Sequence, residues 1–279
     1  LIRFLLGLFA VVGALVFLGC PWRALLRLAG GDLNAIVGII GLVVGVAVGS
    51  QFLKSGYSLG RSHPMPKISG WIFPSIMVLL LVLLILRVSF REGEAIFFSE
   101  KGPGAMHVPV WLGLLCGLCV GALAQRTRFC TMGAIRDALL IRDYHLLSGV
   151  AAFLIVVFLF NLVTGVMQIG WRAMPISHAN PLWNFLGMVL AGLSFALGGG
   201  CPGRQLFLSG EGDTDAAVFC CGMLVGAGLV HNWFLAAVPD KVVDGNFVLG
   251  GPGYYGQLAV IGGIAFCIVL GLTTRPQKV

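Results

Sequence analysis

Residues 19–35 read GCPWRALLRLAGGDLNA, and residues 200–216 read GCPGRQLFLSGEGDTDA. From the cysteine onward the two stretches match at seven of sixteen positions without a gap. Flanking glycines keep the same spacing in both copies, as Gly41 and Gly45 in the first and Gly222 and Gly226 in the second. The chain therefore carries an internal repeat, which we place at 8–53 and 189–234.

Each copy of the repeat predicts a broken helix. Proline is favoured at the first position of a helix, so Cys20 and Cys201 are expected to precede short half-helices. The partial positive charge of a helix N-terminus attracts anions and favours the thiolate form of cysteine. Arg23 and Arg204, three residues after the cysteines, add a cation with planar donors. The alternative is a plain interfacial turn with cysteine as a small apolar residue, and the repetition in register favours a site.

The composition around the repeat is that of a membrane protein. Hydrophobic residues make up 58% of the chain and charged residues 10%, with a mean hydropathy of +0.98, whereas soluble domains are about one quarter charged. A membrane helix needs about 20 apolar residues. Segments of that kind fall near 1–19, 35–53, 71–90, 108–124, 146–169, 183–198, 216–238 and 254–273.

We therefore expect an all-α polytopic membrane protein with eight or nine transmembrane helices, inverted repeats and short broken or re-entrant half-helices. All 279 residues are assigned to a single transmembrane transport domain, 1–279. The two leading helices of the repeat are the first and the sixth expected spans, so the copies should run in opposite directions, as in transporters that bind substrate at the repeat interface. The 18 Lys and Arg residues divide 11 to 7 between the two sides, which predicts that both termini are inside.

A third cysteine lies in an electropositive stretch, QRTRFCTMGAIRDALL at 125–140. Arg128 precedes Cys130, and a helix is expected to begin directly after it, a setting that suits a soft anion. The alternative is a cytoplasmic loop whose arginines only anchor the topology. The stretch KSGYSLGR at 54–61 has a similar pattern, with Ser58 in the corresponding place.

Other motifs indicate structural roles. Cys116 and Cys119 form a CxxC within an apolar helix, where packing in the core is favoured over redox or metal chemistry. No histidine pair has metal-ligand spacing, and neither a P-loop nor a Ser-His-Asp arrangement is present in the sequence. No metal or cofactor is predicted. A net charge of +7 without a basic run argues against nucleic acid as a partner.

Two acidic pairs precede expected spans, Asp32 with Asn34 and Asp213 with Asp215. Helix capping is the favoured role, because aspartate accepts hydrogen bonds from the free N–H groups of a helix N-terminus. Contact with a substrate or an ion is the alternative.

At its three cysteine motifs the sequence resembles the YeeE/YedE family of bacterial inner-membrane sulfur-transport proteins, most closely the YedE branch linked to selenium metabolism. The resemblance extends from about residue 8 to residue 238 and rests on the combination of the motifs at 19–35, 125–138 and 198–216.

The resemblance implies a helical, pseudo-symmetric membrane protein with short loops that reach toward its centre. Family members import thiosulfate, and facing cysteines are proposed to relay it by weak S–H···S hydrogen bonds without covalent capture. Carried over, Cys20, Cys130 and Cys201 would be the relay thiols. The chain departs from the family pattern at Ser58, where a relay cysteine would be expected, and in its length, which suggests that an N-terminal helix is absent.

We therefore expect a transporter or facilitator in the bacterial inner membrane, with no enzymatic activity, for a small sulfur- or selenium-containing anion. The alternatives are a membrane-embedded transferase that forms a cysteine persulfide and a membrane partner of a soluble sulfur-carrier protein. Apart from the anion and a carrier protein, membrane lipid is the expected partner. The candidate substrate-binding residues are Cys20, Arg23, Ser58, Arg128, Cys130, Cys201, Arg204 and Gln205.

Overall fold

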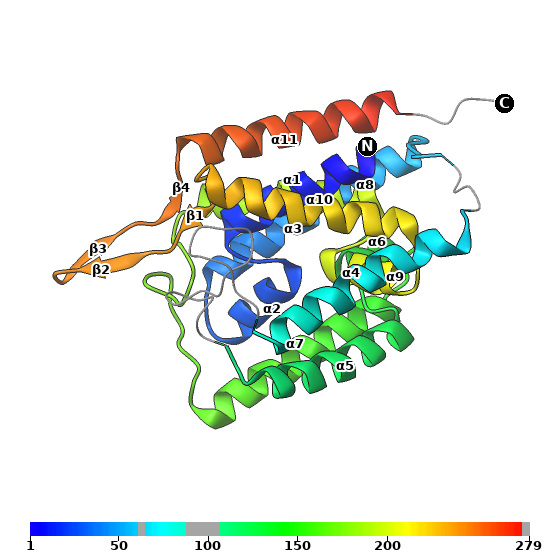
Figure 1. Ribbon diagram of the computed structural model, residues 1–279. Helices are drawn as coiled ribbons and strands as arrows, with labels where there is room; N and C mark the ends of the chain where they lie inside the picture. The colour runs from blue at the N-terminus through cyan, green and yellow to red at the C-terminus, as the bar shows by residue number, and fades with distance from the viewer. Residues whose placement is uncertain (61–64, 88–106, 275–279) are drawn as a thin grey trace.

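The computed structural model describes residues 1–60, 65–87 and 107–274 (Figure 1). Within them, eight helical segments are long and apolar enough to cross a membrane. Three of these segments, Ile2–Ala29, Val110–Leu140 and Pro181–Gly210, are interrupted. The expectation of an all-α polytopic membrane protein with broken helices is confirmed.

The elements follow the chain in a simple order. The helices of the described residues are α1 (Ile2–Phe17), α2 (Pro21–Ala29), α3 (Asn34–Lys54), α4 (Lys67–Ile85), α5 (Val110–Thr127), α6 (Thr131–Leu140), α7 (His145–Thr164), α8 (Pro181–Gly198), α9 (Pro202–Gly210), α10 (Thr214–Asn232) and α11 (Tyr254–Thr273). Four short strands lie between α10 and α11: β1 (Ala237–Val238), β2 (Lys241–Val243), β3 (Asn246–Val248) and β4 (Gly251–Pro252). They form two antiparallel pairs, β1 with β4 and β2 with β3.

The N-terminus and the end of α11 lie on the same side of the molecule (Figure 1). An even number of spans requires this, and the cytoplasmic location of that side stays a prediction. The end of the span expected at 71–90 lies outside the described residues. So do five of the basic residues counted for orientation: Arg61, Arg91, Lys101, Arg275 and Lys278.

Helix α8 forms the centre of the bundle, with an unbroken buried run from Gly187 to Gly198. Helices α4, α5 and α7 lie at the periphery, and α7 has no buried residue. Cys116 and Cys119 on α5 are exposed, so the expectation that they pack in the core is wrong. The apolar character of α5 suits a surface that faces lipid, and hydrophobicity alone does not distinguish that surface from a core.

The two repeats pack against each other through glycine. A Cβ atom at Gly41 of α3 would collide with the carbonyl oxygen of Phe185 in α8, and one at Gly222 of α10 would collide with that of Phe4 in α1. The two contacts are equivalent in the repeat, because Gly222 lies 181 residues after Gly41 and Phe185 lies 181 residues after Phe4. This is the shift that relates the two Gly-Cys-Pro motifs.

The direction of the repeats follows from further contacts. Gly13 of α1 lies against Gly187 and Ala191 of α8, and the His178 ring, just before α8, hydrogen-bonds the Val16 carbonyl. Later residues of α1 therefore lie beside earlier residues of α8, and the two leading helices are antiparallel. The inverted arrangement expected from the sequence is present.

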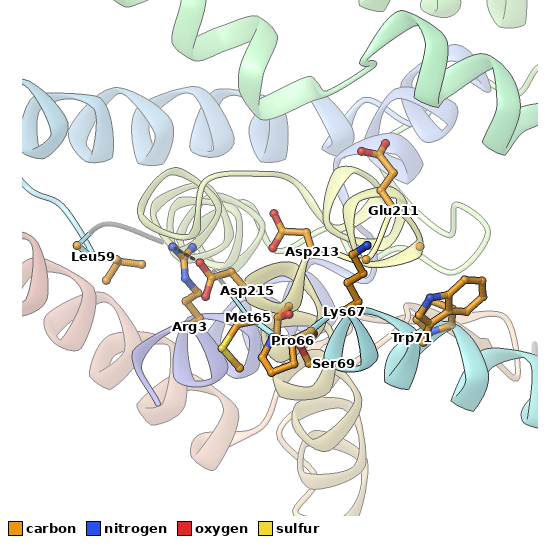
Figure 2. A pocket seen from close by; sticks show the side chains of 16 residues that line it. Arg3, Leu59, Met65, Pro66, Lys67, Ser69, Trp71, Glu211, Asp213 and Asp215 are labelled. Carbon is orange, nitrogen blue, oxygen red and sulfur yellow. Dashed lines mark hydrogen bonds and ion pairs between the residues drawn. The ribbon is translucent and has the colours of Figure 1, made fainter. Parts of the chain in front are cut away.

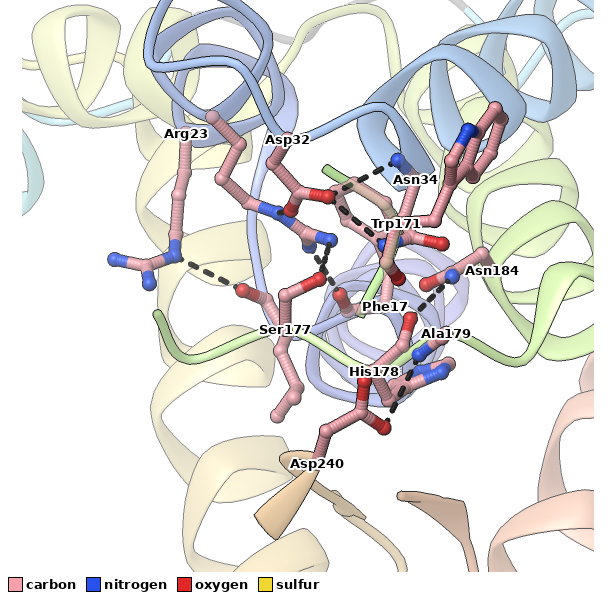
Figure 3. Close-up of polar contacts among 12 residues, drawn as sticks. Phe17, Arg23, Asp32, Asn34, Trp171, Ser177, His178, Ala179, Asn184 and Asp240 are labelled. Carbon is pink, nitrogen blue, oxygen red and sulfur yellow. Dashed lines mark hydrogen bonds and ion pairs between the residues drawn. The ribbon is translucent and has the colours of Figure 1, made fainter. Parts of the chain in front are cut away.

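A buried ion pair fixes the far end of α2 (Figure 3). The Arg27 guanidinium donates to the Asp32 carboxylate over 2.7 Å, to the Phe17 carbonyl over 2.7 Å and to the Ser177 hydroxyl over 2.7 Å. The other Asp32 oxygen accepts from the backbone and side-chain amides of Asn34, each over 3.0 Å. The pair thus joins α2, the start of α3 and the segment before α8.

The acidic pairs of the sequence have different roles in the two repeats. Asp213 caps α10 by accepting from the Ala216 N–H over 3.0 Å, as expected. Asp32 accepts the Asn34 N–H but is also the counter-charge of Arg27, a role that capping alone did not predict.

His178 is fully buried beside this ion pair (Figure 3). Its Nε2 lies 2.8 Å from the Val16 carbonyl, and its Nδ1 accepts from the Asn180 N–H over 3.3 Å. Burial lowers the pKa of the imidazole. The ring is therefore neutral. It holds the segment before α8 by hydrogen bonds and adds no charge beside the Arg27–Asp32 ion pair.

Substitution of Gly41 tests the contact between the repeats. In Gly41→Val the side chain meets the Phe185 backbone, which cannot rotate away as a side chain could, so the α3–α8 contact must separate. Gly117→Val on α5 is the matched control, because nothing lies within 4 Å of its Cβ position. We expect a lower thermal midpoint in detergent for Gly41→Val only. Equal midpoints for the two variants would contradict the packing described.

Removal of the Asp32 charge tests the buried pair. Asp32→Asn keeps the side-chain size but leaves Arg27 buried without a counter-charge, which should cost about 3–5 kcal/mol in unfolding free energy. The control is Asp215→Asn. The ion pair between Asp215 and Arg3 is partly exposed, so its loss should cost only about 0–1 kcal/mol in unfolding free energy. Chemical denaturation of both variants measures the difference, and equal losses would refute a special role for Arg27 and Asp32.

Candidate functional site

The three broken spans share one backbone geometry. The residue two positions before each cysteine has a left-handed conformation: Leu18 with φ 62°, Arg128 with φ 53° and Gly199 with φ 88°. Only glycine adopts such angles without strain, so Leu18 and Arg128 are held there by the surrounding structure. The sequence repeat predicts the breaks before Cys20 and Cys201. The equivalent break before Cys130, which has no proline after it, is shown by the structure.

Each cysteine is the N-cap of the half-helix that follows. Cys20 and Cys201 have extended backbones and precede Pro21 and Pro202, the first residues of α2 and α9. Cys130 is also extended, and its sulfur accepts the Gly133 N–H over 3.2 Å. A sulfur atom at this position lies where the free N–H groups of the helix favour negative charge.

Two of the cysteines meet inside the protein. The side chains of Cys130 and Cys201 interact with each other, and the Thr131 hydroxyl lies beside the Cys201 thiol. Cys201 is 0% exposed and Cys130 is 6% exposed. The breaks in the α5–α6 and α8–α9 spans therefore bring two thiols together in the interior.

Trp22 connects the third break to this pair. Its ring lies against the position where a Cβ of Gly203 would be, 5.4 Å from the Phe129 ring and 6.0 Å from the Phe207 ring by centroids. Gly203 is two residues after Cys201, and Phe129 directly precedes Cys130. Cys20 is partly exposed. The first turn of the half-helix that it begins packs, through Trp22, on both of the other cysteine loops.

Two candidate binding residues hold the breaks in place. The Arg23 Nε donates to the Leu18 carbonyl over 3.0 Å, and the buried Gln205 Nε2 donates to the Gly198 carbonyl over 3.0 Å. These carbonyls stand at the helix ends where backbone partners are missing. Arg23 and Gln205 therefore stabilise the interrupted backbone beside Cys20 and Cys201, and direct contact with a substrate stays a prediction.

The remaining candidates are more peripheral. Arg128 is exposed, and the Ser58 hydroxyl accepts the Gly60 N–H over 3.2 Å. The residue before Ser58, Tyr57, is buried and its hydroxyl donates to the Leu197 carbonyl over 3.4 Å. The loop of Ser58 therefore lies against the end of α8, just before the Gly199 break.

An open cavity of about 760 Å³ lies elsewhere (Figure 2). It is bounded by the start of α1, the start of α4 and the α9–α10 loop, at the end of α9 opposite Cys201. Its charged lining residues are Arg3, Lys67, Glu211, Asp213 and Asp215. Carboxylates outnumber the cations, and Asp215 pairs with Arg3 over 2.9 Å. This lining is poorly suited to an anion, so the cysteine cluster is the better candidate site.

The chain is similar to known proteins of one kind. A family model described as sulphur transport matches residues 126–277, which include the motifs of Cys130 and Cys201. The thiosulfate transporter TsuA of Spirochaeta thermophila is 35% identical over 156 residues, 52% of this chain and 46% of that protein. The thiosulfate transporter TsuA of Escherichia coli is 32% identical over 104 residues, 36% of this chain and 28% of that protein.

The aligned regions thus span less than half the length of either curated relative. No solved structure matches the chain. Both relatives are named as transporters, in agreement with the expectation that the chain is not an enzyme. The finer assignment to a selenium branch stays a prediction.

Proposed function

Since this chain belongs to the sulphur transport family, we propose that it passes thiosulfate, or its selenium analogue, across a bacterial inner membrane along Cys20, Cys130 and Cys201. The contact between Cys130 and Cys201 carries the proposal. Both thiols are buried, belong to different spans and stand at helix N-termini. A substrate that reached them would be inside the protein and surrounded by groups that favour negative charge.

Thiols suit the soft end of such an anion. Sulfur is polarizable and an S–H group is a weak donor, so it matches a terminal sulfur or selenium better than a hard oxygen. Weak contacts at several sites also permit release, which conduction requires. The local positive end of each half-helix supplies attraction without a fixed counter-charge that would trap the anion.

A persulfide-forming transferase is less well supported. Sulfur transfer requires attack by a thiolate and access for an acceptor, and Cys201 is completely buried. Cys20 is only partly exposed.

Removal of the paired thiols tests the proposal. We expect Cys130→Ala and Cys201→Ala each to lower uptake of labelled thiosulfate into proteoliposomes by about tenfold or more, because the soft contact inside the membrane is lost. The matched control is Cys116→Ala, whose side chain is exposed on α5, and its uptake should equal that of the unmodified protein.

The same preparations separate transport from sulfur transfer. Mass spectrometry after incubation with thiosulfate should show no covalent adduct on Cys130 or Cys201. Unimpaired uptake by either alanine variant would count against the thiol path, and a persulfide on either residue would support the transferase.

A further inference from the structure

Three buried donor atoms without a hydrogen-bond partner belong to residues in the first turns of the half-helices that follow the three cysteines. They are Trp22 Nε1, Thr131 Oγ1 and Arg204 Nη1, each unpartnered within the described part of the chain. Thr131 is only 3% exposed. The Glu211 carboxylate lies 4.0 Å from Arg204 Nη1, which is beyond hydrogen-bond distance.

Each of the three breaks supplies one of these donors. Thr131 directly follows Cys130 and lies beside the Cys201 thiol. Arg204 is three residues after Cys201, but its Nη1 lies 4.0 Å from Glu211 at the end of α9 opposite Cys201, so this donor is not part of the cysteine cluster. Trp22 is two residues after Cys20, with its ring against Gly203 in the first turn of α9. The Trp22 indole and the Thr131 hydroxyl therefore come from different parts of the sequence to the same cluster.

Unpartnered donors at such a position indicate a ligand. Buried polar groups are almost always hydrogen-bonded, because an unsatisfied donor that has left water costs free energy. The other unpartnered buried atoms of the described residues are Ser50 Oγ, Asn184 Oδ1 and Asp240 Oδ2, of which the last two only accept. Around the cysteines, by contrast, the Trp22 indole and the Thr131 hydroxyl can both donate to an anion.

From this cluster we infer that Trp22 and Thr131 bind the oxygen atoms of the transported anion, a second pole of the site that adds to the proposed thiol path and rests on it. Thiosulfate has a terminal sulfur at one end and three oxygens at the other. The thiols of Cys130 and Cys201 contact the sulfur, while the Trp22 indole N–H and the Thr131 hydroxyl donate to the oxygens. Hydrogen bonds to a charged acceptor are the strong ones.

The two poles define the substrate class. An anion must carry an SO₃-type group together with a soft terminal atom, sulfur or selenium, to satisfy both sets of contacts. Sulfate leaves the thiols without a soft partner, and hydrosulfide leaves the two donors unpaired. Discrimination of this kind is strong because unpaired buried donors penalise the wrong ligand.

Variants that delete only the donor atoms test the inference. Trp22→Phe keeps a ring against Gly203 and Phe129 but lacks the N–H, and Thr131→Val keeps the shape but lacks the hydroxyl. We expect each to raise the KM for labelled thiosulfate uptake by about tenfold or more. Thr131→Ser retains the hydroxyl and should keep a KM close to that of the unmodified protein.

Matched controls remove the same groups elsewhere. Trp111→Phe alters an exposed indole on α5, and Thr164→Val removes an exposed hydroxyl that bonds to its own helix at Phe160; neither should change KM. Equilibrium binding of labelled thiosulfate to each purified variant accompanies uptake, so that a folding defect is recognised as loss of binding sites rather than a weaker Kd.

The outcomes separate the two claims. If Cys201→Ala abolishes uptake while Trp22→Phe and Thr131→Val retain the Kd and KM of the unmodified protein, the oxygen-binding role is overturned and the thiol path stands. If thiosulfate is neither bound nor transported by the unmodified protein, the proposed function itself fails. Weaker Kd in both donor variants, with recovery in Thr131→Ser, supports the inference.

Discussion

The arrangement of the molecule depends on backbone-to-backbone contact between helices at glycine. In lipid no hydrophobic force brings helices together, so close packing of small residues must hold them. Gly41 against Phe185 and Gly222 against Phe4 are the same contact in the two repeats, related by 181 residues. A side chain at either glycine would push α3 from α8 or α10 from α1, and the half-helices that follow α1 and α8 would lose their positions.

The packed helices position the chain breaks that carry the chemistry of the site. Helices α1 and α8 end inside the protein because Leu18 and Gly199 turn the chain into left-handed conformations, and the next half-helices begin at Cys20 and Cys201. Irregular backbone at membrane depth is stable only where protein or a cavity surrounds it. The α5–α6 break contributes Cys130, so that sulfur atoms, helix N-termini and unpartnered donors gather in one region. The buried Arg27–Asp32 pair anchors the far end of α2.

Much of this could be predicted from the sequence, and the reasons for the rest are physical. Proline after Cys20 and Cys201 determines where helices restart, so both breaks were predictable. Trp22 and Tyr57 were missed because their roles depend on contacts with Gly203 and Leu197, which are far away in sequence. An aromatic residue directly inside a Gly-Cys-Pro motif was the available signal for Trp22. The exposure of Cys116 on α5 could not be foreseen, since an apolar helix in a membrane suits lipid and core equally.

The most direct test of the central claim is the position of the soft atom in a complex. Selenosulfate carries selenium in place of the terminal sulfur, and its anomalous scattering locates that atom in a crystal. The account predicts a selenium peak in van der Waals contact with the thiols of Cys130 and Cys201. A peak in the acidic cavity beside Arg3 and Glu211, with the region around the two cysteines empty, would contradict it.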